Sequence, residues 1–348
     1  MIWFGERAYS YAKACGIIGK SFVGRRTAAL RSVGRLSELD RLIFGPSARE
    51  LPERELLPDL EKRLLKRSVE SIFSVVNAYK NPPELFSLLI RVYEYNDLKN
   101  ALAMIASEEA NFRTKPPFVE LGRFGTVRFA AWPHVKTMLK ETEFEFLLDE
   151  NGRLKKDYDG LSLETILDRH YYKKLWKSIR RLRKSDRRTA EHISAEEISL
   201  RNCAWVLRLR TYYGMLSEEL KRHLIMLDDE PRLSKDALEA LELPLDSRSE
   251  WEQWSRARFL NPEGSRSRRV FSGGEVWNAD PRYFQNAAAK YLYKLAFHNF
   301  RRKPVSIDAV FCFIKLKQFE EDLLTSNAEG LDMGMAGRDV LDILETEA

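Results

Sequence analysis

The chain has 348 residues, of which 44% are hydrophobic and 32% are charged. This length normally corresponds to two or three domains, and the apolar fraction is enough to fill their cores. The net charge of +6 favours an anionic partner, whether protein, lipid headgroup or nucleic acid. The longest apolar runs, 101–106 and 309–314, are too short to span a bilayer, and the first residues lack a signal-peptide pattern. Three scattered cysteines, Cys15, Cys203 and Cys312, fit a reduced compartment better than a disulfide framework.

In chain order, hydrophobic periodicity predicts a series of helices and no series of strands. The first helix is expected over 5–22, and it carries small residues at Ala8, Ala12, Cys15 and Gly19 that would let another helix approach closely. One or two short helices follow in 25–44. Longer helices are expected over 56–78, 85–105, 163–182, 195–212, 284–300 and 307–324.

Local signals add detail to two of these helices. Ser194 and Glu197 have the spacing of a capping box, which predicts that a helix begins at Ser194, and Gly214 is a natural stop for it. Asn96 and Asn100 lie one turn apart in an earlier helix. Because Asn is a poor residue in mid-helix, these two side chains are expected to bond to a neighbouring helix.

A similar helix ending occurs three times along the chain. Aligning Asn100 with Asn202 also aligns Glu94 with Glu196, Leu98 with Leu200 and Lys99 with Arg201. Aligning Pro83 with Pro304 brings Leu98 against Phe319 and Leu102 against Leu323. Such repetition predicts an all-α fold of three similar helical units with approximate threefold character. The units are expected at 1–109, 110–214 and 215–333, followed by a loosely held acidic tail at 334–348.

Candidate catalytic and cofactor motifs are weak. The segment 16–21 ends in Gly-Lys-Ser, but only two residues separate its glycines, and Ala14 stands where a phosphate loop needs its first glycine. A close-packed helix is therefore the favoured interpretation. The five histidines share no zinc-type spacing with one another or with the cysteines, and no nucleophile elbow or dinucleotide fingerprint occurs. We expect no catalytic residue, no metal site and no cofactor.

The strongest charge feature is the segment 169–188, which holds ten Lys or Arg and a single acid, Asp186. As one helix, it would place its basic residues on one face, at Lys173, Lys177, Arg180 and Lys184. Its apolar stripe would consist of Tyr171, Leu175, Ile179 and Leu182. This face is a candidate electrostatic interface. Docking to an acidic protein, or simple solvation, is favoured over phosphate binding because no zinc-finger or helix-turn-helix signature accompanies it.

Several motifs in this order resemble the C-subunit family of V-type ATPases. They are Ala-Tyr-Ser-Tyr-Ala-Lys-Ala at 8–14, Tyr-Asn-Asp-Leu-Lys-Asn at 95–100, Ile-Leu-Asp-Arg-His-Tyr-Tyr at 166–172, Leu-Arg-Asn at 200–202 and the closing helix pair. The family includes the C subunits of bacterial and archaeal V/A-type ATPases and the d subunits of eukaryotic vacuolar enzymes. The resemblance covers about residues 5–333. The third unit departs from the pattern, with Glu-Glu-Asp at 320–322 in place of a basic residue and Asn.

The resemblance implies a funnel-shaped, pseudo-threefold helical protein without catalytic residues. Such a protein joins the central stalk to the ring of membrane proteolipid subunits and transmits torque for ion transport. It would be peripheral, on the cytoplasmic face of the membrane, with one copy per complex and no nucleic-acid partner. Two other interpretations stay open: a helical nucleic-acid-binding protein that uses the basic segment 169–188, and a stand-alone helical adaptor.

Overall fold

The computed structural model describes residues 2–106, 116–155, 158, 160–260 and 279–344. Helices account for 75% of the described residues, and no strand forms among them, which confirms the all-α prediction. One isolated antiparallel bridge joins Leu148 to Leu154. The expected boundary between the first two units, at residues 109 and 110, lies outside the described ranges.

The N-terminal third contains four α-helices and a long 3₁₀ turn. In order these are α1 (Ile2–Lys20), η1 (Gly24–Ser32), α2 (Leu36–Phe44), α3 (Glu53–Val76) and α4 (Glu84–Ala106). The expected helix over 85–105 matches α4 closely, because its apolar residues recur every three or four positions.

The middle of the chain alternates short turns with two long helices. Its α-helices are α5 (Val135–Leu139), α6 (Gly160–Arg181), α7 (Lys184–Tyr213) and α8 (Ser217–Leu220). The C-terminal third contains α9 (Lys235–Glu242), α10 (Arg248–Gln253), α11 (Pro281–Arg302), α12 (Ile307–Asp332) and α13 (Gly337–Leu344). Short 3₁₀ turns lie at Gly45–Ser47, Gly122–Phe124, Phe129–Ala131, Glu145–Leu147, Lys221–His223, Pro231–Ser234 and Ala257–Phe259.

The capping-box prediction at Ser194 is wrong. α7 begins ten residues earlier, at Lys184, and Ser194 is buried in mid-helix. The helix extends through this point because its N-terminal part is itself packed in the core. Ala190 and Ile193 are buried, and the Thr189 hydroxyl donates to Asp308 of α12 at 3.0 Å. The predicted stop is confirmed: Gly214 caps α7 in the left-handed conformation, with φ of 59°.

The stripe of small residues on α1 does not receive another helix. Ala12, Cys15 and Gly19 are exposed, and a Cβ added at Gly19 would meet no atom within 4 Å. α1 instead buries Ala14 and Ile18 on its other side. The stripe therefore faces away from the core, which corrects the expected close packing.

The tail is held more firmly than its composition suggests. Residues 337–344 form α13, and the Gly337 amide donates to the Val33 carbonyl at 2.9 Å. Val340 is buried, where it adjoins Gly330 of α12. The tail is thus docked on η1 and α12 as far as residue Leu344. Its last residues, 345–348, lie outside the described ranges.

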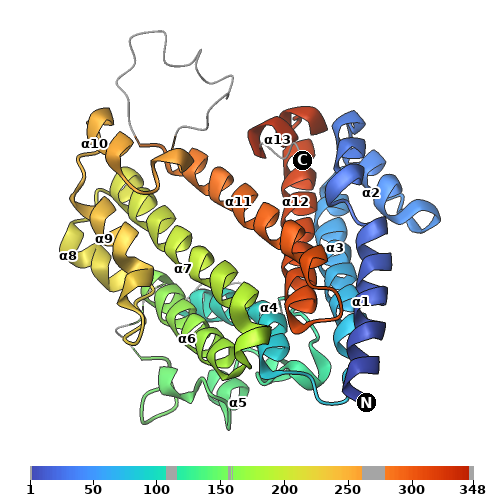
Figure 1. Ribbon diagram of the computed structural model, residues 1–348, viewed down its shortest axis with the longest axis horizontal. Coiled ribbons are helices and arrows are strands. Elements are labelled where there is room, and N and C mark those ends of the chain that lie inside the picture. The colour runs from blue at the N-terminus through green and yellow to red at the C-terminus, as the bar shows by residue number, and fades with distance from the viewer. Residues whose placement is uncertain (1, 107–115, 156–157, 159, 261–278, 345–348) are drawn as a thin grey trace.

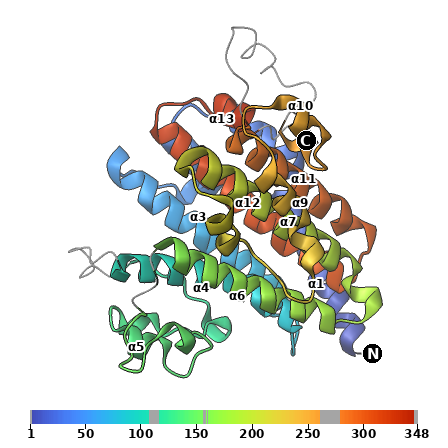
Figure 2. The ribbon, with the colours of Figure 1, turned by 90° about the vertical axis from the view of Figure 1, so that its left-hand side faces the viewer.

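Helices that are distant in sequence supply many of the packing contacts, alongside the consecutive pair α11 and α12. α3 lies along α12, and α4 lies along α6, while α11 packs against both α12 and α7 (Figures 1 and 2). The consecutive helices α3 and α4 touch one another much less. The largest core cluster contains buried side chains from α1, α3, α4, α6, α7, α11 and α12. N-terminal and C-terminal helices therefore pack into one shared core.

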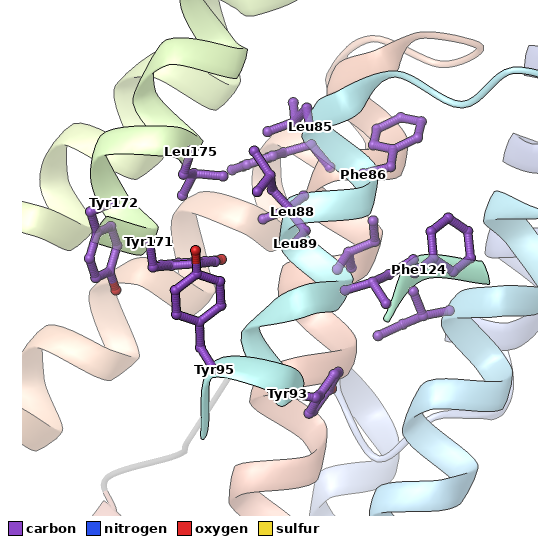
Figure 3. Close-up of a cluster of buried hydrophobic side chains, with 14 of the residues drawn as sticks. Leu85, Phe86, Leu88, Leu89, Tyr93, Tyr95, Phe124, Tyr171, Tyr172 and Leu175 are labelled. Atoms are coloured by element: carbon purple, nitrogen blue, oxygen red, sulfur yellow. The ribbon is translucent and has the colours of Figure 1, made fainter. Parts of the chain in front are cut away.

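α4 lies at the centre of this core. Figure 3 shows Leu85, Leu88 and Tyr95 on the side of α6, while Phe86 points away from it. The Tyr95 and Tyr171 rings meet edge to face, with centroids 5.1 Å apart. α4 is thus covered by protein on more than one side. This agrees with its buried residues, which lie on several sides of the helix and not along a single stripe.

Candidate functional site

The basic segment 169–188 is divided between two helices. Lys173, Lys177 and Arg180 lie on α6, which ends at Arg181. Lys184 is the first residue of α7, after Arg183 adopts an extended conformation with ψ of 146°. The predicted single helical face is therefore broken at the turn between the two helices. All four candidate side chains are nevertheless exposed.

Two of the four candidates have acidic partners within the chain. Lys173 lies 3.6 Å from the Asp228 carboxylate, in an exposed pair that solvent screens. Arg180 lies 2.9 Å from Glu191 and 3.9 Å from Glu230. Lys177 and Lys184 have no ion pair among the described residues. Among the four candidates, the charge available for an external partner is therefore concentrated on these two lysines.

Other cations of the segment also form ion pairs within the chain. Lys174 forms an ion pair with Glu143, and Arg181 reaches Glu84 of α4 at 2.6 Å. Burial, together with the nearby Arg91, lowers the pKa of Lys174. Part of the basic content of 169–188 is thus structural, which the charge count alone did not distinguish.

A carboxylate missed by sequence reasoning joins three helices beside this segment. Asp168 of α6 is buried, and it accepts from Lys99 of α4 through one oxygen and from Arg201 of α7 through the other, at 2.7 Å. Burial alone would lower the pKa of Arg201, but Tyr172 and Asp168 outweigh that effect and raise it. The alignment of Lys99 with Arg201 was the available signal, but nothing in it indicated a shared acidic partner.

Of the repeated asparagines, only one forms side-chain hydrogen bonds within the described part of the chain, and its main partner, Ile225, lies in a loop rather than on a neighbouring helix. Asn202 is fully buried, accepts from the Ile225 amide at 2.8 Å and donates to the Ile225 carbonyl at 3.0 Å. Asn96 and Asn100 are exposed, and neither forms a side-chain hydrogen bond within the described part of the chain. The expectation is therefore wrong for these two, because their face of α4 is open to solvent.

A hollow of about 350 Å³ is lined by residues of α6, α7, α11 and α12. Its wall carries charged groups of both signs, including Glu197, Arg201, Arg208 and Asp322. The Asp322 side chain is exposed and lies in the lining of the hollow. Such a polar, concave wall suits contacts that require charge complementarity.

Next to Asp322 lies a set of buried ionisable groups on α12. Lys317 and Glu320 form a buried ion pair, and Glu320 also accepts from the Phe22 amide at 2.6 Å. Glu321 accepts from the Tyr93 hydroxyl at 2.9 Å. Desolvation, reinforced by the charge of Asp322, raises the pKa of Glu321 to about 7. The segment 320–322 is where the sequence departs from the predicted repeat, and its two glutamates form their bonds within the fold.

Two kinds of feature do not occur in the described ranges. Within them, no group of three or more His, Cys, Asp or Glu is placed to hold a metal ion. Among the helices described, none is both long and apolar enough to cross a membrane.

The Gly-Lys-Ser segment lies at the end of α1, where Gly16 and Lys20 are helical and exposed.

Comparison with protein-family models assigns the chain to one family. The model of the ATP synthase (C/AC39) subunit family matches residues 45–340, which is most of the chain. An uncharacterized protein of Treponema pallidum (strain Nichols) is 27% identical over 333 residues, covering 94% of this chain and 93% of that protein. The match includes both walls of the hollow and the basic turn between α6 and α7. The chain therefore belongs to the ATP synthase C/AC39 subunit family.

Proposed function

We propose that this chain is the central-stalk rotor subunit of a V-type ATPase, a socket that joins the shaft to the membrane proteolipid ring without catalysing a reaction. The observation that carries the proposal is the family match over residues 45–340. One copy would sit in each complex, peripherally, at the cytoplasmic face of the membrane. The division into units at 1–109, 110–214 and 215–333, arranged as a pseudo-threefold funnel, is part of this proposal.

The packing of the helices supports a mechanical role. A torque-transmitting subunit must resist shear between the surface that touches the shaft and the surface that touches the ring. Here α3 with α12 and α4 with α6 join distant parts of the chain in one core, so force on either end is shared across the fold. Close-packed interiors have low compressibility and transmit strain.

The two charged surfaces supply candidate contacts. The hollow beside Arg208 and Asp322 offers a polar wall, and the turn between α6 and α7 offers Lys177 and Lys184. Electrostatic contacts give register and orientation while keeping the joint sensitive to salt. We propose that Lys173, Lys177, Arg180 and Lys184 contribute to one of these joints, with the two unpaired lysines contributing most.

Co-purification tests this proposal. An affinity-tagged chain recovered from detergent-solubilised membranes should bring down stalk subunits and proteolipid subunits in fixed proportion, before and after nuclease treatment. Recovery of the chain alone, or with neither class of subunit, would contradict the rotor assignment. Enrichment with nucleic acid that nuclease abolishes would instead favour the alternative, a nucleic-acid-binding protein using the segment 169–188.

A further inference from the structure

Two long segments of this chain contain no acidic residue. Between Glu6 and Glu38 the sequence has seven Lys or Arg, and between Asp280 and Asp308 it has six. The rest of the chain then holds 45 basic and 52 acidic residues, so it is net negative. The net positive charge of the whole protein therefore comes from these two segments. The more conspicuous basic segment at 169–188 does not account for it.

The fold brings the two segments together around a hollow of about 830 Å³. Four arginines line it: Arg25, Arg26 and Arg31 from η1, and Arg301 from the last turn of α11. Apolar side chains also contribute to the lining, from Ile18, Val23, Phe297 and Phe300. No Asp or Glu is among the described residues of the lining. The hollow is thus cationic at its wall and partly apolar.

A rigid turn presents these arginines. The Phe22 amide donates to Glu320 of α12 at 2.6 Å, and the Gly24 amide donates to the Tyr293 hydroxyl of α11 at 3.0 Å. Gly24 has φ of +74°, and a Cβ there would lie 3.4 Å from the Phe297 ring. The backbone that leads into η1 is therefore fixed by one hydrogen bond to α12 and one to α11. Arg25 and Arg26 follow this fixed point directly, so little of their backbone freedom is left to lose on binding.

The guanidinium groups are available for an external acid. Arg25, Arg26 and Arg301 are exposed, and within the described part of the chain none of them forms an ion pair. Arg26 lies over the Phe22 ring at 4.4 Å and donates one N–H to the last carbonyl of α1, while Arg301 lies over the Phe297 ring at 5.5 Å. Stacking on a ring orients a guanidinium, and the remaining N–H groups at its edge can still bind a carboxylate.

A second hollow of about 540 Å³ continues the first along α11. It is lined by Tyr293, Lys294, Phe297, His298, Arg301 and Arg302, so the two hollows share Phe297 and Arg301. Together they form one groove, called here the arginine groove, in which aromatic and cationic side chains alternate. Its extent suits an elongated ligand better than a single small anion.

We propose that the arginine groove docks an acidic, partly apolar segment of a partner protein, with its carboxylates on Arg25, Arg26 and Arg301 and its apolar side chains on Phe297 and Phe300. The planar fork of Arg matches a carboxylate through two parallel hydrogen bonds. This docking surface goes beyond the proposed rotor function, which assigns no role to η1 or to the end of α11.

A lipid bilayer fits this surface less well than a protein segment. Proteins that lie on a membrane insert protruding apolar side chains below the headgroups. In the arginine groove, Phe300 is buried and Phe297 is half-buried, so neither projects from the surface. A single chain segment can enter such a groove, whereas a flat layer of headgroups contacts only its rim.

Binding of a designed acidic peptide tests the proposal. The probe is a fluorescein-labelled 16-residue helical peptide of Glu with Leu and Phe, and its control has Gln at every Glu. In fluorescence anisotropy, the double variant Arg25→Glu/Arg301→Glu should raise the dissociation constant of the Glu probe about tenfold or more. The matched control Lys62→Glu/Lys66→Glu reverses two exposed charges on α3 and should change it about twofold or less. Circular dichroism and thermal unfolding check that each variant is folded.

A second measurement reports from the groove itself. Cys15 lies in the lining and is exposed, whereas Cys203 and Cys312 are buried, so a polarity-sensitive maleimide dye should label Cys15 selectively. Adding the Glu probe should shift the emission of this dye, and the Gln probe should not. If the charge-reversal variant fails to fold, Arg25→Gln/Arg301→Gln takes its place in both measurements.

Three results would overturn the proposal. One is an equal loss of peptide binding in the groove variant and in the α3 control. Another is equally tight binding of the Gln peptide. The third is retention of peptide binding by Arg25→Glu/Arg301→Glu while its co-sedimentation with vesicles of phosphatidylglycerol and phosphatidylcholine is lost, which would make the groove a site for lipid headgroups.

Discussion

Lys99 and Arg201 bind the two oxygens of a single carboxylate, that of Asp168. The two cations occupy equivalent positions in the sequence alignment of the first and second predicted units, and they reach Asp168 from α4 and α7. Only 8% of the Asp168 side chain is exposed, so its charge depends on these partners. The link therefore ties three helices at the centre of the molecule.

Asp168→Asn should lower the free energy of unfolding by about 1–3 kcal/mol, because it leaves two partly buried cations without their counter-charge. The loss is smaller than for a fully buried pair because the Arg201 side chain is 37% exposed and solvent screens its charge. Urea unfolding measures the change. Asp228→Asn is the matched control, since it removes only the exposed pair with Lys173 and should cost about 0–0.5 kcal/mol. Equal losses in the two variants would refute a structural role for the Asp168 link.

Gly337→Ala should detach α13. A Cβ at this position would lie 2.2 Å from the Leu30 carbonyl oxygen and 2.9 Å from that of Val33, and backbone atoms cannot move aside cheaply. We expect a loss of about 1–3 kcal/mol in unfolding free energy, with faster proteolysis of the C-terminal segment. Gly19→Ala is the control: it meets no atom within 4 Å and should be neutral or gain about 0.5–1 kcal/mol in helix stability. Unchanged proteolysis of the Gly337 variant would show that α13 is not docked on η1.

Glu321 should make stability depend on pH. Its pKa is raised from 4.5 to about 7, so between these values the folded state binds more protons than the unfolded state. The contribution of Glu321 to stability is therefore fully present below about pH 4.5 and is lost as the pH rises through about 7.

Comparison with Glu321→Gln isolates this contribution. The stability of the variant relative to the wild type should increase from pH 5 to pH 7.5, measured by urea unfolding at a series of pH values in that interval. Glu70→Gln, which alters an exposed carboxylate on α3, should run parallel to the wild type. A Glu321→Gln profile that is also parallel would mean that Glu321 titrates normally in the folded protein.

Periodicity predicted the long helices well because a buried helix must repeat its apolar residues every three or four positions. α4, α6 and α11 lie close to their expected ranges, whereas α12 begins at Ile307 as expected and continues eight residues further, to Asp332. Local signals failed where tertiary packing overrode them. Ser194 has a capping-box spacing, yet the helix continues upstream because Thr189 and Ile193 are buried against other elements.

The charged sites were harder to predict, because their partners come from distant parts of the chain. Lys99 is separated from Asp168 by 69 positions in the sequence, and Arg181 is separated from Glu84 by 97. A count of basic residues at 169–188 cannot distinguish those that pair with acids of the same chain from those that are free to bind another molecule. Likewise, Asn100 and Asn202 each follow a leucine and a basic residue, but only Asn202 is covered by another segment, at Ile225.

Reversing charge at the turn between α6 and α7 should weaken the proposed joint. A variant with Lys173, Lys177, Arg180 and Lys184 all changed to Glu should lower ATP-driven ion transport while hydrolysis by the detached catalytic head continues. The defect should deepen as ionic strength rises, because screening weakens the remaining contacts. Lys62→Glu/Lys66→Glu serves again as the charge control. Normal coupling of the fourfold variant at both low and high salt would leave this face as a solvated surface.

The central claim is that this chain couples shaft rotation to ion movement, and the most direct test measures both activities in membrane vesicles with and without the chain. The account predicts that deletion abolishes ATP-driven ion transport while ATP hydrolysis by the catalytic head persists, and that restoring the wild-type chain restores transport. Ion transport that proceeds at the wild-type rate in vesicles lacking the chain would contradict it.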